Sequence, residues 1–152
     1  MEKLKNILLV DDDEITNYIN CDLIKELNIT ENISVANNGK EALDYLIKAH
    51  QSPAPEGFYV PDLIFLDINM PVMNGFQFLE DYYYLLGDKK LSTIVTMLTT
   101  SLIKEEVSRA LEMVHVVKGY IEKPLTKEII MEIYNTHLEL QDQKPARVRR
   151  KG

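Results

Sequence analysis

The sequence predicts an α/β domain, a doubly wound parallel sheet of five strands with helices on both faces. Short apolar stretches alternate along the chain with longer stretches of helical period. This alternation occurs five times in about 140 residues, and parallel neighbouring strands require crossover helices of this kind. A chain of 152 residues is long enough for one such domain and leaves little room for a second.

The first half of the chain contains two strand-and-helix units. Ile7–Val10 is continuously apolar, as expected of a strand covered on both faces. The helix predicted after it has an apolar stripe with residues spaced by three or four, namely Ile15, Tyr18, Ile19, Leu23 and Leu27. Ile33–Ala36 is the second strand. Asn37, Asn38 and Gly39 separate it from a helix bearing Ala42, Leu43, Leu46 and Ile47.

The second half contains three more units after a loop. Segment 51–60 includes Pro53, Pro55 and Gly57 and has no period, so we expect no regular element there. Strand Asp62–Leu66 and a helix over Asn74–Leu86 form the third unit. Strand Ser92–Leu98 precedes a helix with Val107, Ala110, Leu111 and Val114. Strand Gly119–Ile121 precedes a helix that Thr126 caps and that carries Ile130, Ile133, Tyr134 and Leu138 on one face.

Composition and charge exclude several classes of protein. Hydrophobic residues make up 45% and charged residues 27%, which argues against a disordered, collagen-like or coiled-coil chain. The single cysteine, Cys21, excludes an internal disulfide, and we interpret it as a small buried hydrophobic residue. No apolar run is long enough for a membrane span or a signal peptide, so we expect a cytoplasmic protein.

The charge is unevenly distributed. The formal net charge is −7, but residues 142–152 carry a local +4, which leaves −11 on the rest. We therefore predict one domain over residues 1–141 and a basic, disordered tail over 142–152. Because an acidic body repels the phosphate backbone, no nucleic-acid partner is expected.

Polar residues follow four of the predicted strands: Asp11, Asp12 and Asp13 the first, Asp67 the third, Thr99 and Thr100 the fourth, Lys123 and Pro124 the fifth. In such sheets ligands bind at the carboxyl ends of the strands, so we expect these residues to converge. Carboxylates 4 Å apart repel by roughly 4 kcal/mol per pair at an effective dielectric of about 20, which calls for positive charge. Mg²⁺ and the Lys123 ammonium would supply it. A carboxylate flanked by Mg²⁺, an ammonium and a hydroxyl is suited to receive a phosphoryl group.

Each of these residues also has a simpler interpretation. The aspartate run could cap a helix, and we assign that role to Asp13 in any case. Asp67 alone could be a turn residue, and Lys123-Pro124 alone could end a strand. Chance is a poor explanation for finding all of these residues at the ends of alternating strands.

Four motifs together resemble the receiver domain of two-component response regulators. They are ILLVDDD at 7–13, LDINMPVMNG at 66–75, LTTS at 98–101 and GYIEKP at 119–124, and the resemblance covers about residues 5–140. Chemotaxis regulators and single-domain phytochrome-associated regulators are similar. The resemblance implies a flavodoxin-like (βα)5 fold with strand order 2-1-3-4-5 and a cis peptide before Pro124.

The resemblance also implies a role for each site residue. Asp67 would be the phosphoacceptor and a Mg²⁺ ligand, Asp12 a direct Mg²⁺ ligand, and Asp11 an outer ligand acting through water. The backbone carbonyl of Asn69 would complete the protein's contribution to the metal site. Asn69 and Ser101 would flank the path of the water that hydrolyses the phosphoryl group.

The remaining roles implied by the resemblance belong to the switch. Lys123 would pair with Asp67 and then with the phosphoryl oxygens. Thr99 would donate its hydroxyl to the phosphoryl group, and Tyr120 would turn inward as Thr99 moves. A phosphoryl group adds about −1.5 to −2 charge, which would bias a two-state equilibrium of this kind.

The resemblance implies a sensor histidine kinase as the donor and a switch protein rather than a conventional enzyme. With no output domain expected, the chain would act on a downstream protein or pass the group to a histidine phosphotransfer protein, and both alternatives stay open. A phosphatase of the haloacid dehalogenase type is a further alternative, with its Asp-x-Asp signature at Asp11 and Asp13, although Ile15 stands where that signature has Thr or Val. A degenerate receiver that binds partners without phosphorylation is the last.

Two features depart from the family pattern. Segment 51–60 is longer than usual, and His115 lies where small residues are common; we interpret His115 as a packing or surface residue.

The helix over 74–86 has apolar residues on more than one face, namely Phe76, Phe78, Leu79, Tyr82, Tyr83, Leu85 and Leu86. We expect one of two explanations. Either part of this set contacts a partner or a second copy in a homodimer, or the whole set forms a broad core face.

Overall fold

A computed structural model of the chain describes residues 2–71, 73–87, 93–100, 108 and 117–142. It contains a five-stranded parallel sheet with the order β2-β1-β3-β4-β5. This confirms the doubly wound fold and the predicted strand order. The strands are β1 (Leu4–Val10), β2 (Thr30–Ala36), β3 (Leu63–Asp67), β4 (Ile94–Thr99) and β5 (Val117–Glu122).

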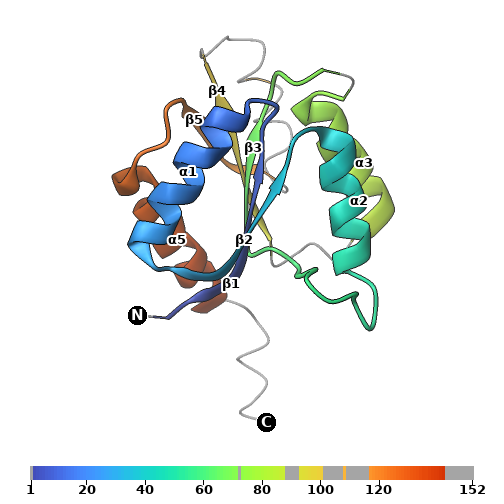
Figure 1. The fold of residues 1–152 in the computed structure, drawn as a ribbon, viewed down its shortest axis with the longest axis horizontal. Helices are drawn as coiled ribbons and strands as arrows, with labels where there is room; N and C mark the ends of the chain where they lie inside the picture. The colour runs from blue at the N-terminus through green and yellow to red at the C-terminus, as the bar shows by residue number, and fades with distance from the viewer. Residues whose placement is uncertain (1, 72, 88–92, 101–107, 109–116, 143–152) are drawn as a thin grey trace.

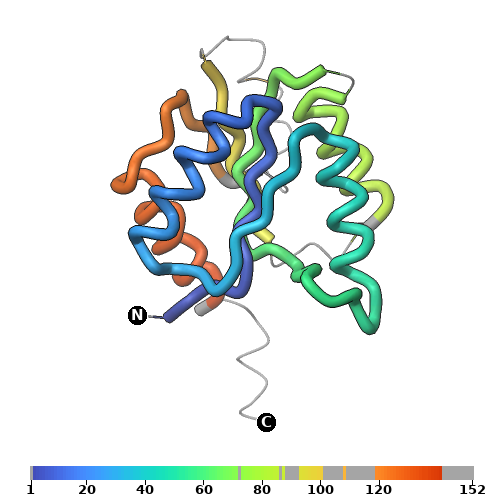
Figure 2. The backbone as a smooth tube through the Cα atoms, in the orientation of Figure 1, coloured from blue at the N-terminus to red at the C-terminus, as the bar shows by residue number. Residues whose placement is uncertain are grey.

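Helices cover both faces of the sheet. They are α1 (Glu14–Leu27), α2 (Gly39–Ala49), α3 (Gly75–Leu86) and α5 (Lys127–Asp142). Helices α1 and α5 lie on one face, and α2 and α3 lie on the other (Figure 1). The backbone trace shows the chain crossing from one face to the other between strands (Figure 2). No helix in the described ranges is long and apolar enough to cross a membrane.

The alternating side chains of β1 explain why its sequence is continuously apolar. Ile7 and Leu9 pack in the cluster on the α1 and α5 face, whereas Leu8 and Val10 pack in the cluster on the α2 and α3 face. All four are almost fully buried. A strand buried on both faces needs apolar side chains at every position, which is the pattern that predicted it.

The strands begin earlier than predicted at β1 and β2. Strand β1 starts at Leu4, which pairs with Thr30 of β2, and it includes the fully buried Asn6. Asn6 is tolerated inside because its amide donates to the Tyr45 hydroxyl at 3.0 Å and to the Tyr59 carbonyl at 2.8 Å. Since Tyr59 belongs to the loop over 51–60, that loop supplies a hydrogen-bond partner that sequence periodicity did not reveal.

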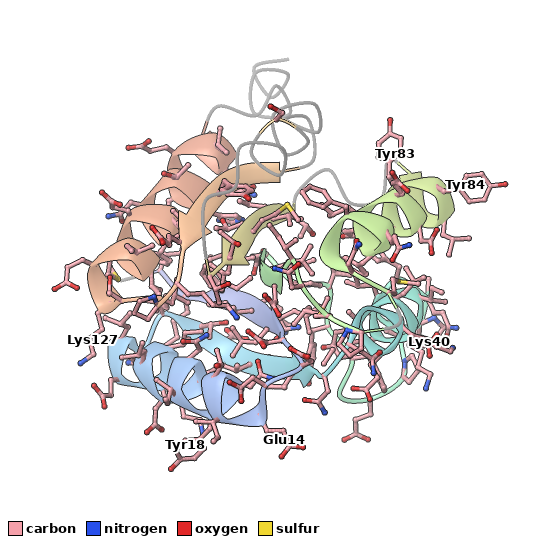
Figure 3. The ribbon with its side chains drawn as sticks, turned by 90° about the horizontal axis from the view of Figure 1, so that it is seen from above. Glu14, Tyr18, Lys40, Tyr83, Tyr84 and Lys127 are labelled. Atoms are coloured by element: carbon pink, nitrogen blue, oxygen red, sulfur yellow. The ribbon has the colours of Figure 1, made fainter. Side chains whose placement is uncertain are left out.

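The apolar stripe predicted for α1 is wrong in its first half. Ile15 and Tyr18 are each 70% exposed and Ile19 is 51% exposed, and Tyr18 points away from the sheet (Figure 3). The buried residues of α1 are instead Asn17, Asn20 and Ile24. Asn17 faces inward because its amide donates to the backbone carbonyl of Asp11 at 2.9 Å. Cys21 is half-buried and packs against the core, as a small hydrophobic residue would.

The apolar residues of α3 divide between the core and the surface. Phe76, Phe78, Leu79 and Tyr82 are buried, whereas Tyr83, Tyr84 and Leu85 are exposed near the end of the helix. Figure 3 shows Tyr83 and Tyr84 on the outside of the molecule. The broad core face is therefore confirmed for the first part of α3, and self-association through the second part stays a prediction. The described residues leave out Ser101, His115, all but residue 108 of the helix predicted around Val107–Val114, and residues 143–152 of the predicted tail. Asp142, the first residue of that tail, is the last residue of α5.

Candidate functional site

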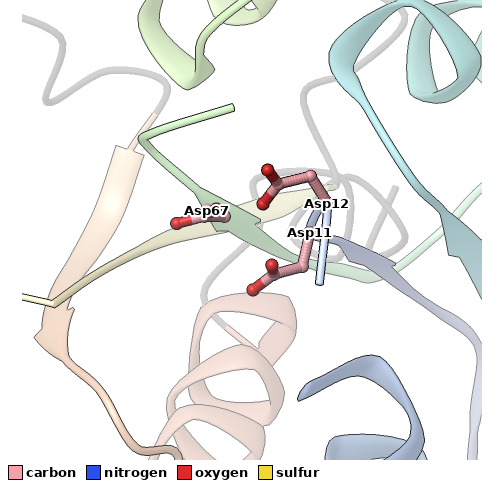
Figure 4. Close-up of side chains that lie close together, drawn as sticks. All are labelled: Asp11, Asp12 and Asp67. Atoms are coloured by element: carbon pink, nitrogen blue, oxygen red, sulfur yellow. The ribbon is translucent and has the colours of Figure 1, made fainter. Parts of the chain in front are cut away.

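Three carboxylates converge at the carboxyl edge of the sheet (Figure 4). Asp11 and Asp12 follow β1, and Asp67 is the last residue of the neighbouring strand β3. One carboxylate oxygen of each lies within 4.8 Å of the others. Asp11 and Asp67 are buried and Asp12 is exposed, so the cluster opens to solvent on one side.

Lys123 brings positive charge to this cluster from the loop after β5. Its ammonium lies 2.7 Å from Asp11 Oδ2 and 3.3 Å from Asp67 Oδ1. The Lys123 backbone N–H donates to the Thr99 carbonyl at 2.7 Å, and the peptide bond to Pro124 is cis, as the resemblance implies. The shorter contact with Asp11 was missed by sequence reasoning, because residues 112 positions apart carry no local signal of their pairing.

The environment of Asp67 disfavours its charged form. Burial raises the pKa of Asp67 to about 6, repulsion from Asp11 adds to this effect, and Lys123 opposes it. Burial by itself would lower the pKa of Lys123, but its hydrogen bond to Asp11 and the charges of Asp67 and Asp11 outweigh burial and raise it. The site therefore holds more negative charge than Lys123 neutralises.

The donor set fits a small divalent cation. Carboxylate oxygens are hard ligands, and Mg²⁺ is commonly held by one or two carboxylates together with water. Asp11, Asp12 and Asp67 are the residues that would hold it, and its charge would offset both the cost of burying the Asp67 carboxylate and its repulsion by Asp11. Asn69 lies two residues after Asp67 with its side chain exposed.

Asp13 does not join the cluster. It is the N-cap of α1, and its carboxylate accepts hydrogen bonds from the Ile15 N–H at 3.0 Å and the Thr16 hydroxyl at 2.8 Å. These bonds lower the pKa of Asp13. The predicted cap is confirmed, and the Asp-x-Asp alternative loses its second acid because that carboxylate is committed to the helix.

Thr99 and Tyr120, the two residues predicted to form the switch, lie on the adjacent strands β4 and β5. Thr99 ends β4 and is fully buried, and Asp67 is in register with its neighbour Leu98. Tyr120 is half-buried and packs against the core cluster on the α2 and α3 face. Both residues therefore lie on the strands β4 and β5, on the opposite side of β3 from β1.

The N-terminus of α3 approaches the Asp67 backbone closely at Gly75. A Cβ atom on Gly75 would lie 2.8 Å from the Asp67 carbonyl oxygen and 3.0 Å from Ile68 Cα. The Gly75 N–H donates to the Ile68 carbonyl at 2.8 Å, which fixes this approach. Only glycine fits here without displacing the end of β3.

We expect Gly75→Ala to lower the free energy of unfolding by about 1–3 kcal/mol, because backbone atoms must move to accept the methyl group. Urea unfolding would measure the loss. A free energy of unfolding equal to that of the original chain would show that the backbone accommodates the methyl group without cost.

Residues 7–135 match the response regulator receiver domain. The crystal structure of a two component response regulator from Cytophaga hutchinsonii is 30% identical, with a TM-score of 0.80, and the match covers 91% of this chain and 99% of that one. The bacteriophytochrome response regulator AtBRR is 26% identical, with a TM-score of 0.66 and coverage of 90% and 94%.

A curated relative shows how far the likeness extends. The protein-glutamate methylesterase/protein-glutamine glutaminase of Desulfotalea psychrophila is 45% identical over 49% of this chain, but the match spans only 18% of that protein. The likeness thus concerns a receiver segment, which is a phosphoacceptor switch domain. The chain belongs to the response regulator receiver domain family of two-component signalling.

Proposed function

We propose that Asp67 accepts a phosphoryl group from the phosphohistidine of a sensor histidine kinase and that this modification switches a protein-binding surface. The observation that carries the proposal is the position of Asp67. Its buried carboxylate lies beside those of Asp11 and Asp12 and 3.3 Å from the Lys123 ammonium, at the edge of the sheet where ligands bind.

The proposed transfer uses the ionised Asp67 carboxylate as the nucleophile. With a pKa of about 6, most of Asp67 is ionised at pH 7. One carboxylate oxygen forms a bond to phosphorus while the bond between phosphorus and the donor imidazole nitrogen breaks, and the released imidazole takes a proton from water. A bound Mg²⁺ would neutralise charge on the phosphoryl oxygens. Lys123 would also neutralise charge on these oxygens, and Asp11 would hold Lys123 in position.

Exposed apolar side chains beside this edge support docking of the donor there. Ile15 and Ile19 of α1 are both more than half exposed. Ile19 also lines a cavity of about 150 Å³ with Thr16, Asn20, Lys123, Pro124 and Leu125. A donor that covers these residues would bring its phosphohistidine to the same edge as Asp67.

The proposed switch proceeds through Thr99 and Tyr120. A phosphoryl group on Asp67 would attract the Thr99 hydroxyl, and the movement of Thr99 would open space for Tyr120 of the adjacent strand. The altered surface would include β5 and α5. A downstream protein or a histidine phosphotransfer protein would bind it.

The test is the intact mass of the chain after incubation with acetyl phosphate and Mg²⁺. We expect the mass of one phosphoryl group to be added with the metal and not with a chelator, and peptide mapping should place it on Asp67. No addition under either condition would favour a degenerate receiver. Transfer from the phosphorylated chain to a histidine phosphotransfer protein would distinguish a relay carrier from a terminal regulator.

A further inference from the structure

Asn17 is a polar residue on the buried face of α1. Its side chain is only 5% exposed, and its amide nitrogen donates to the Asp11 backbone carbonyl at 2.9 Å and to Asn37 Oδ1 at 3.5 Å. The amide nitrogen makes both of these bonds. The amide oxygen, Oδ1, is buried and has no hydrogen-bond partner in the part of the chain that the structure describes. An unpaired buried carbonyl carries a desolvation penalty, so the two hydrogen bonds that Asn17 donates are made at a cost to stability.

The carbonyl that Asn17 holds belongs to the peptide that joins Asp11 to Asp12. Other bonds already fix Asp11: its N–H donates to the Ala36 carbonyl at 3.1 Å, Oδ1 accepts from the Asp13 N–H at 2.9 Å, and Oδ2 accepts from Lys123 at 2.7 Å. Because a peptide group is planar, fixing its carbonyl also fixes its N–H and the direction in which the chain enters Asp12. Asn17 thus holds the peptide from which Asp12, the exposed member of the acidic cluster, extends.

We infer that Asn17 is a positioning residue that sets the affinity of the acidic cluster for a divalent cation. The inference rests on the proposed function, because the cation is the one that the proposed transfer requires. Asn17 does not touch the cation. It acts through its hydrogen bond to the Asp11–Asp12 peptide. Its hydrogen bond to Asn37 connects this peptide to the segment between β2 and α2.

The matched control is Asn6, a second buried asparagine at the opposite end of β1 from the acidic cluster. Its amide donates to a backbone carbonyl, that of Tyr59, at 2.8 Å, and it is fully buried. Asn6→Leu and Asn17→Leu make the same chemical change at two buried positions. A general loss of stability would affect both variants, whereas loss of positioning would affect Asn17→Leu alone.

The test is a titration of the unphosphorylated chain with MgCl₂, followed by the NMR shifts of backbone amides near Asp12. We expect the Kd for Mg²⁺ to rise about 10-fold in Asn17→Leu, since removal of outer hydrogen-bond partners of metal ligands typically costs 10–100-fold in affinity. The Kd of Asn6→Leu should stay within about 2-fold of the original value. Urea unfolding of both variants would show whether their stabilities are comparable.

An unchanged Kd in Asn17→Leu would overturn the inference and leave the proposed function intact. If the original chain itself does not bind Mg²⁺, both the inference and the proposed function fail. Should Asn17→Leu not fold, Asn17→Ala removes the same donor from a smaller side chain and is judged by the same change in Kd. An equal rise in Kd in Asn6→Leu would also overturn the inference, because it would assign the effect to lost stability.

Discussion

Replacing Asp67 by asparagine is expected to stabilise the unphosphorylated, metal-free chain by up to about 3 kcal/mol at pH 7. The carboxyl has a pKa of about 6 in the fold and an ordinary value of 3.8, and a difference of about 2 corresponds to ~3 kcal/mol. The fold disfavours the charged form, mainly because Asp67 is buried and secondarily because Asp11 repels it. Asparagine has the same shape and no charge to bury.

The effect of Asp67 on the free energy of unfolding depends on pH in a way that follows from its two pKa values. Below pH 3.8 the carboxyl is protonated in both the folded and the unfolded chain, so its ionisation contributes nothing. Between pH 3.8 and 6 the unfolded chain loses the proton first, and the destabilisation grows; above pH 6 it is complete. The advantage of Asp67→Asn should therefore be about 3 kcal/mol at pH 7 and only about 0.5 kcal/mol at pH 4.

Urea unfolding of the original chain and of Asp67→Asn at both pH values would measure the difference. Asp81→Asn, an exposed carboxyl on α3, is the control and should change stability by less than about 0.5 kcal/mol. A variant less stable than the original chain at pH 7 would show that Lys123 stabilises the carboxylate by more than burial costs. The same variant should take up no phosphoryl group from acetyl phosphate.

Replacing Lys123 by methionine is expected to destabilise the metal-free chain by about 3 kcal/mol at pH 7. The ammonium contacts both buried carboxylates of the cluster, and removing one partner of a buried ion pair leaves uncompensated charge. The pKa of Asp67 should rise above about 6, because the attraction that opposes its rise is lost. At pH 4 the loss should be smaller, since Asp67 is then protonated.

The control for this prediction is Lys127→Met. Lys127 forms an ion pair with Glu26, and both side chains are about half exposed, so its removal should cost less than about 1 kcal/mol. NMR titration of the Asp67 carboxyl carbon would give its pKa in Lys123→Met. An Asp67 pKa that does not move would contradict the charge coupling between these two residues. Added Mg²⁺ should recover part of the stability, because it supplies the missing positive charge.

The sequence by itself determined the fold and the location of the acidic cluster. Alternation of apolar strands with helical stretches requires parallel strands, and parallel strands bring Asp11 and Asp67 to one edge. This inference needs only local periodicity and connectivity, both of which are present in the chain itself. For the same reason the N-cap role of Asp13 could be predicted from its place before α1.

Only the tertiary structure decided which polar residues are buried and which charges meet. An apolar stripe on α1 does not show that Asn17 will find partners in Asp11 and Asn37 and thereby turn Ile15 to the surface. The short contact of Lys123 with Asp11 and the raised pKa of Asp67 likewise depend on distances between segments far apart in the chain. Hydrogen bonding and desolvation are set by the complete surroundings of a group, and a linear sequence does not contain those surroundings.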